Sequence, residues 1–263
     1  MDTTLNTHVK LFDLSGRSVL LTGGSRGLGR AMASAMVCAG ADMMIVGRDP
    51  ATLSRAVDEI KSNANGKVEY AVGDLTNRRD LDAIVECALA SLGKIDILVN
   101  NAGAYLAERL VEISDANWDH LFELNLTSCM RLTRAIAPSM VERKWGRIIH
   151  VSSVLAMASR LGCSSYSATK AALIGMTRAS ALELGPHGVT VNCLAPGAFN
   201  SISPDATPTE RQNGNFAAVT ALGRWGKPDE LAGPALLLAS NAGSYITGSV
   251  LVVDGGALCR TLY

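Results

Sequence analysis

The sequence carries little charge and no excess of either sign. Charged residues make up 18% of the 263 residues, and 24 Lys and Arg balance 24 Asp and Glu, so the formal net charge is zero. Because nucleic acids and acidic membrane surfaces attract proteins through a net or clustered positive field, this balance argues against both as partners. Aromatic residues are scarce, at 5%, whereas hydrophobic residues reach 48%. This composition is typical of a chain that buries much of its surface.

The chain also lacks closely spaced cysteines and an unbroken apolar run. The six cysteines are too widely spaced for a disulfide framework or a C-x-x-C metal clip, which favours a reducing compartment. The longest uncharged stretch, 231–253, contains glycine, proline and asparagine, and predicts a helix, a turn and a strand. Residues 1–10 are polar, unlike a signal peptide. We therefore expect a cytoplasmic protein, and no metal site, because the four histidines share no metal-ligand spacing.

Short apolar runs alternate with longer amphipathic segments along the chain. Continuous apolar runs are typical of parallel strands that are covered on both faces. We predict strands at 18–21, 43–46, 68–72, 95–99, 147–151, 189–194 and 250–253. We predict helices at about 27–39, 51–62, 78–92, 115–142, 166–185 and 228–239. This order predicts an α/β fold, a Rossmann-like doubly wound parallel sheet of about seven strands with helices on both faces and a single domain.

A glycine-rich turn follows the first predicted strand. Residues 18–29 read SVLLTGGSRGLG, with Gly23, Gly27 and Gly29 between the strand and the next helix. Glycines let the backbone approach a pyrophosphate, and the helix N-terminus offers free N–H groups to it. This context predicts dinucleotide binding.

The cofactor is predicted from the end of the second strand. A carboxylate there binds the adenosine ribose of NAD, whereas basic residues bind the additional phosphate of NADP. Arg48 at this position and Arg26 in the glycine turn are suited to pair with one phosphate, which favours NADP over NAD. In the alternative, both arginines are solvated and Asp49 binds the ribose.

The irregular segment 196–215 follows a predicted strand. It therefore lies at the carboxyl end of the sheet, where α/β proteins bind ligands. We interpret it as a substrate lid, with an ordinary long loop as the alternative. Residues 1–10 are interpreted as an N-terminal tail, and 11–263 as a single NAD(P)-binding Rossmann catalytic domain.

A tyrosine and a lysine begin the predicted helix 166–185. Tyr166 and Lys170 are four residues apart and so project from one face of the helix. A neighbouring ammonium favours the phenolate, which makes Tyr166 a candidate general acid and base for an alcohol and a carbonyl. Ser152 and Ser153 end the preceding strand, at the edge of the sheet where active sites form.

Seven motifs together resemble the classical short-chain dehydrogenase/reductase family over residues 11–258. They are TGGSRGLG at 22–29, Asp74 after the third strand, NNAG at 100–103, Asn125 in LNL, Ser153, YSATK at 166–170, and PG at 196–197. The resemblance implies an oxidoreductase that acts on CH–OH donors with NADP.

The resemblance also implies the roles of the catalytic residues. Tyr166 would be the proton donor, Lys170 would bind the nicotinamide ribose and favour the tyrosinate, and Ser153 would hold the substrate oxygen. Asn125 would position a water on the proton relay to Lys170.

For the cofactor, the resemblance places Asp74 on the adenine amino group and residues 101–103 beside the adenosine ribose. A helix or turn cap at Asp74 and strand-end stabilisation by the asparagines are the alternatives. Residues 196–197 would lie along the nicotinamide, and Ser201 near its amide or the pyrophosphate. The complete predicted set is Gly23, Ser25, Arg26, Gly27, Leu28, Gly29, Arg48, Asp74, Leu75, Asn101, Ala102, Gly103, Tyr166, Lys170, Pro196, Gly197 and Ser201.

The substrate prediction depends on segment 222–231, LGRWGKPDEL, which resembles gluconate 5-dehydrogenases and related sugar-acid or polyol oxidoreductases. The alternative is a 3-oxoacyl-[acyl-carrier-protein] reductase, which is disfavoured because His187 stands where that group tends to have an arginine. A non-catalytic NADP(H)-binding protein is the alternative from another class. The resemblance further suggests a homotetramer through helices 115–142 and 166–185, whose apolar residues lie on more than one face.

Overall fold

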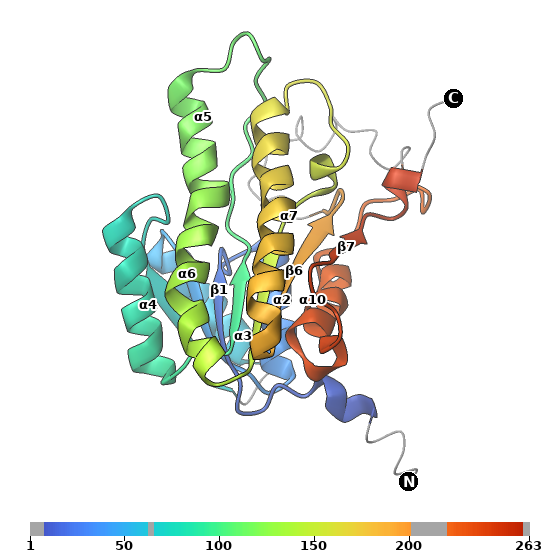
Figure 1. The fold of residues 1–263 in the computed structure, drawn as a ribbon. Coiled ribbons are helices and arrows are strands. Elements are labelled where there is room, and N and C mark those ends of the chain that lie inside the picture. The colour runs from blue at the N-terminus through green and yellow to red at the C-terminus, as the bar shows by residue number, and fades with distance from the viewer. Residues whose placement is uncertain (1–7, 63–65, 201–219, 260–263) are drawn as a thin grey trace.

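The computed structural model describes residues 8–62, 66–200 and 220–259. Seven parallel strands form one sheet in the order β3-β2-β1-β4-β5-β6-β7 (Figure 1). The strands are β1 (Ser18–Thr22), β2 (Asp42–Gly47), β3 (Val68–Val72), β4 (Ile97–Asn100), β5 (Gly146–Val151), β6 (Val189–Pro196) and β7 (Val250–Val253). The predicted doubly wound α/β fold is confirmed.

Helices cover both faces of the sheet, and Figure 1 shows α6 and α7 in front of it. The helices are α2 (Gly27–Cys38), α3 (Pro50–Lys61), α4 (Arg78–Leu92), α5 (Asp115–Phe122), α6 (Ser128–Glu142), α7 (Ser164–Leu184) and α10 (Ala232–Ala239). The strand order reverses between β1 and β4, because the chain winds outward from β1 through β3 and then from β4 through β7. Such a switch point is where open α/β sheets bind ligands, at the carboxyl ends of the strands.

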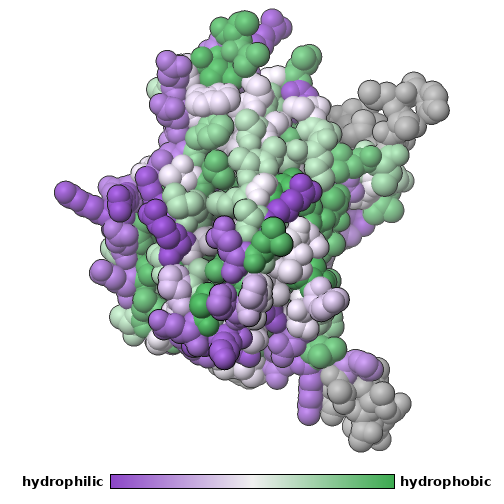
Figure 2. Space-filling view, viewed as in Figure 1, coloured by the Kyte–Doolittle hydropathy of each residue, from purple (hydrophilic) through white to green (hydrophobic). Residues whose placement is uncertain are grey.

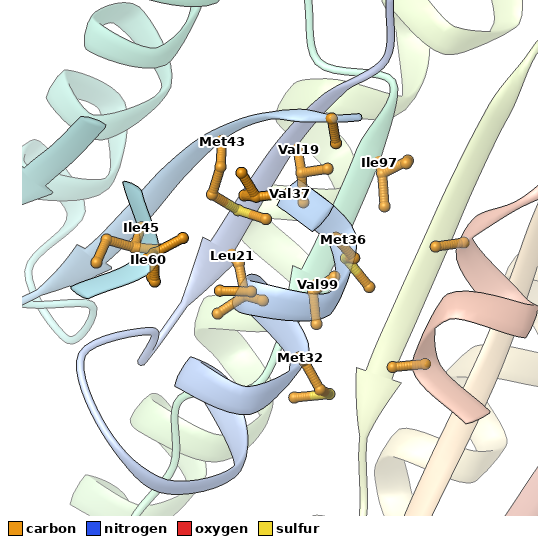
Figure 3. Packing of buried hydrophobic residues seen from close by; sticks show 14 of the residues in the cluster. Val19, Leu21, Met32, Met36, Val37, Met43, Ile45, Ile60, Ile97 and Val99 are labelled. Carbon is orange, nitrogen blue, oxygen red and sulfur yellow. The ribbon is translucent and has the colours of Figure 1, made fainter. Parts of the chain in front are cut away.

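Strand β1 shows why the apolar runs are continuous. Successive side chains of a strand point to opposite faces. Val19 and Leu21 therefore pack in the core with α2, whereas Leu20 packs in the second core with α4 and α6. Figure 3 shows Leu21 close to Met32 and Met36 of α2. Because both faces are buried, every position of β1 is inaccessible to solvent.

The predicted helix 115–142 has the predicted bounds, and one π-helical turn lies within it. It consists of α5, a π-helical turn at Glu123–Thr127 (η2), and α6. The hydrophobic pattern passes through this turn without a visible break, which is why the sequence predicts one element. A π-turn inserts an additional residue into the helical path and is frequent at functional sites. Here it contains Asn125.

Other element boundaries differ by a few residues at most. The last predicted helix, 228–239, begins as a 3₁₀ turn (Pro228–Leu231) and continues as α10. Helix α7 begins at Ser164, so Tyr166 lies in its first turn. Residues 201–215 of the predicted lid, and Ser201 with them, lie outside the described residues, and the domain boundaries stay a prediction. In the described part of the chain, no helix combines the length and apolarity needed to span a bilayer.

Candidate functional site

The glycine turn between β1 and α2 has the geometry that close approach of a phosphate requires. Gly23 and Gly27 adopt φ values of +69° and +55°, which side-chain-bearing residues rarely adopt. A Cβ atom on Gly29 would lie 2.1 Å from the carbonyl oxygen of Gly23 and 2.6 Å from Nδ2 of Asn101. The turn therefore tolerates no side chain at Gly29. Helix α2 begins here, and its first N–H groups face the space above the turn.

A pocket of about 510 Å³ lies above this turn, a size suited to a small-molecule cofactor. It brings together twelve residues predicted from the sequence. These are Gly23, Ser25, Arg26, Gly27, Leu28, Gly29, Arg48, Asp74, Leu75, Asn101, Ala102 and Gly103. Sequence reasoning missed five further lining residues, Gly47, Thr52, Gly73, His120 and Leu124. His120 and Leu124 come from α5 and η2, and no motif signals that this segment folds over the pocket.

Asp49 and the two arginines line the same pocket but differ in their engagement. The Asp49 carboxylate caps α3, where it accepts hydrogen bonds from the Ala51 N–H at 3.0 Å and the Thr52 hydroxyl at 2.5 Å. These bonds, that of Thr52 first, hold the pKa of Asp49 below its ordinary value. The carboxylate is thus hydrogen-bonded to the first turn of α3, while Arg26 and Arg48 bring positive charge to the pocket wall.

Asn101 and Asp74 each stabilise the strand end at which they lie. The Asn101 side chain donates to the carbonyls of Thr22, at 2.9 Å, and Gly23, at 3.1 Å, and so joins the end of β4 to the glycine turn. Asp74 accepts from the N–H of Thr76 at 2.9 Å and from its hydroxyl at 2.8 Å. The Thr76 N–H, more than any other group, lowers the pKa of Asp74, so the carboxylate is ionised at neutral pH. The turn-cap role that the sequence left open for Asp74 is therefore present in the structure.

The candidate catalytic residues lie at the carboxyl end of β5 and the start of α7. Lys170 is only 4% exposed, and its Nζ donates to the Val151 carbonyl at 2.8 Å. The same Nζ lies 5.7 Å from the centroid of the Tyr166 ring. The Ser152 hydroxyl donates to the Lys170 carbonyl at 2.8 Å, which fixes α7 against β5. Ser153 is 8% exposed, and its Oγ accepts from the Leu155 N–H at 3.1 Å.

Asn125 connects this catalytic edge to the segment after β4. Its Oδ1 accepts from the Ala104 N–H at 2.8 Å, and its Nδ2 donates to the Ala104 carbonyl at 2.9 Å. The same Nδ2 donates to the Thr169 hydroxyl at 3.2 Å, which in turn donates to the Tyr166 carbonyl. A Cβ on Gly103 would lie 3.0 Å from Asn125 Oδ1 and 3.3 Å from Lys170 Nζ. Because Gly103 also lines the 510 Å³ pocket, the pocket reaches the candidate catalytic residues.

Pro196 and Gly197 lie at the end of β6, outside the lining of that pocket. The Gly197 N–H donates to the Val253 carbonyl at 2.9 Å, and a Cβ at this position would lie 2.7 Å from that of Asp254. Close contact with β7 thus explains the glycine without any ligand. Among the described residues, no three His, Cys, Asp or Glu side chains are grouped so as to hold a metal ion.

Tyr105 is a second tyrosine that sequence reasoning missed. Its ring packs edge-to-face on that of Tyr166, with centroids 5.2 Å apart and planes at 78°. Arg160 donates from Nη2 to the Tyr105 hydroxyl at 2.7 Å and from Nε to the Cys163 sulfur at 3.3 Å. Cys163 is fully buried at the start of α7. The only sequence signal for Tyr105 is its position two residues after NNAG.

His150 lies buried in β5, as the sequence predicts. Its Nδ1 lies 3.1 Å from Nδ2 of Asn100 on β4, and its Nε2 is buried without a hydrogen-bond partner in the described structure. Burial, assisted by the charge of Lys170, lowers the pKa of His150 to about 4. The imidazole is therefore neutral in the folded protein at neutral pH.

Fold and site together define an α/β protein with a glycine turn suited to a dinucleotide and with a pocket that reaches Gly103, beside Lys170. The family model described as short chain dehydrogenase matches residues 17–212. The chain belongs to this family of alcohol and ketone oxidoreductases.

Relatives with assigned names cover nearly the whole chain. Gluconate 5-dehydrogenase from Gluconobacter oxydans is 36% identical over 254 residues, which span 95% of this chain and 98% of the relative. A 3-oxoacyl-[acyl-carrier-protein] reductase from Aquifex aeolicus is 35% identical, over 92% of this chain and 98% of its own. The crystal structure of a gluconate 5-dehydrogenase from Burkholderia cenocepacia, in complex with NADP and tartrate, has a TM-score of 0.86 at 31% identity and covers 97% of this chain and all of that one.

The glycine turn gives a first prediction. We expect Gly29→Ala to weaken NADP(H) binding by about tenfold or more, because its Cβ meets the Gly23 carbonyl and must displace the turn. Equilibrium binding followed by nucleotide fluorescence measures the loss. Gly233→Ala in α10 is the matched control, since nothing lies within 4 Å of its Cβ position. Unchanged affinity in Gly29→Ala would show that the turn adapts without harm to binding.

His150 gives a prediction about pH. The imidazole titrates near pH 6.5 in the unfolded chain and about 4 in the folded protein, so only the unfolded state takes up the proton between these values. Stability is therefore complete above about pH 6.5 and falls by up to about 3 kcal/mol as the pH decreases toward 4. We expect His150→Gln to flatten this part of the curve in urea unfolding, and the exposed His187→Gln to retain it. Parallel curves for wild type and His150→Gln would contradict the assignment.

Proposed function

We propose that this oxidoreductase interconverts a secondary alcohol and a ketone with NADP(H), and that its substrate is a sugar acid or polyol. The observation that carries the reaction is the junction at Gly103, where the cofactor pocket meets Lys170 and Asn125. Bound NADP(H) would donate or accept the hydride at this junction. The open pocket, the glycine turn and the two arginines fit such a dinucleotide.

In this proposal, the residues at the catalytic edge move the proton. Tyr166 protonates the carbonyl oxygen during reduction and takes the proton back during oxidation. The buried charge of Lys170, 5.7 Å from the tyrosine ring, stabilises the tyrosinate, and its Nζ is placed to bind the nicotinamide ribose. Ser153 orients the substrate oxygen. The Asn125 side chain bonds to both backbone groups of Ala104. These bonds hold the Asn125 amide near Lys170, where a relay water would bind.

The substrate class is supported by the gluconate 5-dehydrogenases among the relatives. Segment 222–231 resembles the same class in sequence. In the structure, hydrogen bonds between its own residues hold this segment together. Nη1 and Nη2 of Arg224 donate to Glu230, at 2.7 and 2.6 Å, and Glu230 also accepts from the Lys227 N–H. The rival reading as a 3-oxoacyl-[acyl-carrier-protein] reductase is supported by relatives of nearly equal identity. The two classes are therefore separated by assay.

The function is tested with NADPH and two ketone substrates. We expect reduction of 5-keto-D-gluconate with a kcat/KM at least about tenfold above that for an acetoacetyl thioester. Tyr166→Phe should lose turnover of either ketone and still bind NADPH, because it lacks only the transferable proton. The reverse preference would identify an acyl reductase. An active Tyr166→Phe enzyme would remove the tyrosine from the mechanism, and NADPH binding without reduction of either ketone would indicate a non-catalytic binding protein.

The preference for NADP is proposed from Arg26 and Arg48 in the pocket wall and from the engagement of Asp49 with α3. We expect Arg48→Gln to lower the ratio of kcat/KM for NADPH over NADH by about 10- to 100-fold, because a charge-assisted contact to the 2′-phosphate is lost. Arg55→Gln, on the exposed side of α3, removes the same charge nearby and serves as the control. A wild-type preference for NADH, or an unchanged ratio in Arg48→Gln, would contradict this proposal.

The homotetramer through 115–142 and 166–185 stays a proposal that the surface of α6 and α7 supports. Figure 2 shows hydrophobic and near-neutral residues over the middle of this face and hydrophilic residues toward α4. A groove between the two helices is lined by apolar side chains that include Met130, Val141, Met176 and Leu184. A second copy placed on this groove would cover them.

A further inference from the structure

A positive charge stands beside the catalytic tyrosine, outside the cofactor pocket. It belongs to Arg160, which is exposed in the loop between β5 and α7. The hydrogen bonds to Tyr105 and Cys163 fix the plane of its guanidinium, and its Cζ lies 5.2 Å from the centroid of the Tyr105 ring. Tyr105 is in turn 5.2 Å, centroid to centroid, from Tyr166. The Tyr105 ring therefore contacts both the Arg160 guanidinium and the ring of Tyr166, the residue that transfers the proton.

The two loops that carry this charge are fixed to the catalytic edge. The Glu108 N–H donates to the Gly162 carbonyl at 3.0 Å, which pairs the loop after β4 with the loop before α7. Asn125 holds Ala104, the residue before Tyr105, through both backbone groups. Glu108 in turn accepts from Asn117 of α5 at 2.6 Å, which joins this pair of loops to α5. Arg160 is thus held at a set place relative to Tyr166.

This arrangement suits a substrate with an anionic group at a distance from its reacting carbonyl. Arginine is the residue best matched to carboxylates, because its planar fork pairs with both oxygens. Orienting contacts far from the reacting atom raise catalytic efficiency by holding the carbonyl in a reactive position. A hexulosonate is such a substrate, because its carboxylate and its ketone are at different carbons of the chain.

We propose that Arg160, oriented by Tyr105, binds the carboxylate of the substrate and makes the enzyme selective for keto acids over neutral ketoses. This inference rests on the proposed function and assigns the selectivity to a residue outside the cofactor site. In this arrangement the Tyr105 ring packs on Tyr166, and its hydroxyl accepts from Arg160 and lies 3.2 Å from the Cys163 sulfur.

The test compares 5-keto-D-gluconate with L-sorbose, which is the same ketone with a hydroxymethyl group in place of the carboxylate. We expect Arg160→Gln to lower the ratio of kcat/KM for the keto acid over the ketose by about 10- to 100-fold, mainly through KM for the keto acid. Arg160→Lys keeps the charge without the planar fork, so it should retain part of the ratio. Tyr105→Phe, which loses the hydroxyl but keeps the ring, should give an intermediate loss.

Arg109→Gln is the matched control, because it removes one positive charge from an exposed position in the adjoining loop. Its ratio should equal that of wild type, and NADPH binding by every variant shows that it is folded. A ratio in Arg160→Gln within about twofold of wild type, or an equal fall in Arg109→Gln, overturns the assignment of Arg160. A wild-type enzyme that reduces neither sugar substrate overturns the proposed function, and this is seen before any variant is measured.

Discussion

The buried ammonium of Lys170 is the constraint on which the catalytic edge depends. Burying a charge is costly unless hydrogen bonds or opposite charges compensate it. In the described part of the chain, the ion pairs all involve other residues, and Lys170 donates to the Val151 carbonyl instead. Its field acts on buried neighbours, since it contributes to the low pKa of His150. The Tyr166 ring centroid lies 5.7 Å from Nζ, and in the proposed mechanism the charge of Lys170 would stabilise the anion of this tyrosine.

The positions of the other groups follow from how parallel strands end. Register pairs Asn100 of β4 with His150 of β5, so the segments after these strands leave the sheet side by side. The first carries Gly103 and Tyr105, and the second carries Ser153 and Arg160. The π-turn of η2 then brings the Asn125 amide to Ala104, where it pairs with both backbone groups as a strand would. The Asn125 side chain thereby satisfies both backbone groups of Ala104 and connects three elements, namely the segment after β4, η2 and α7.

The fold was predictable because burial on both faces leaves a signal in the sequence itself. Strands β3 and β7 have the predicted bounds, and the glycine turn was recognisable since its spacing reflects a steric limit between Gly29 and Gly23. Contacts between loops leave no such signal. Tyr105 meets Arg160, 55 residues away, only once the loops after β4 and β5 pair, and His120 reaches the pocket only because α5 folds over it. The π-turn was hidden for another reason, because apolar periodicity continues through it.

Asp49 shows how one short segment combines a structural and a functional requirement. Its carboxylate accepts from the Ala51 N–H through one oxygen and from the Thr52 hydroxyl through the other, so a ribose hydroxyl would compete with these bonds. Any loss of them would weaken the cap of α3. Arg48, one residue earlier, is not the N-cap of α3 and lines the pocket directly. Helix capping therefore competes with the NAD-type contact at the position where a carboxylate would make it, and this competition is one of the grounds on which the preference for NADP is proposed.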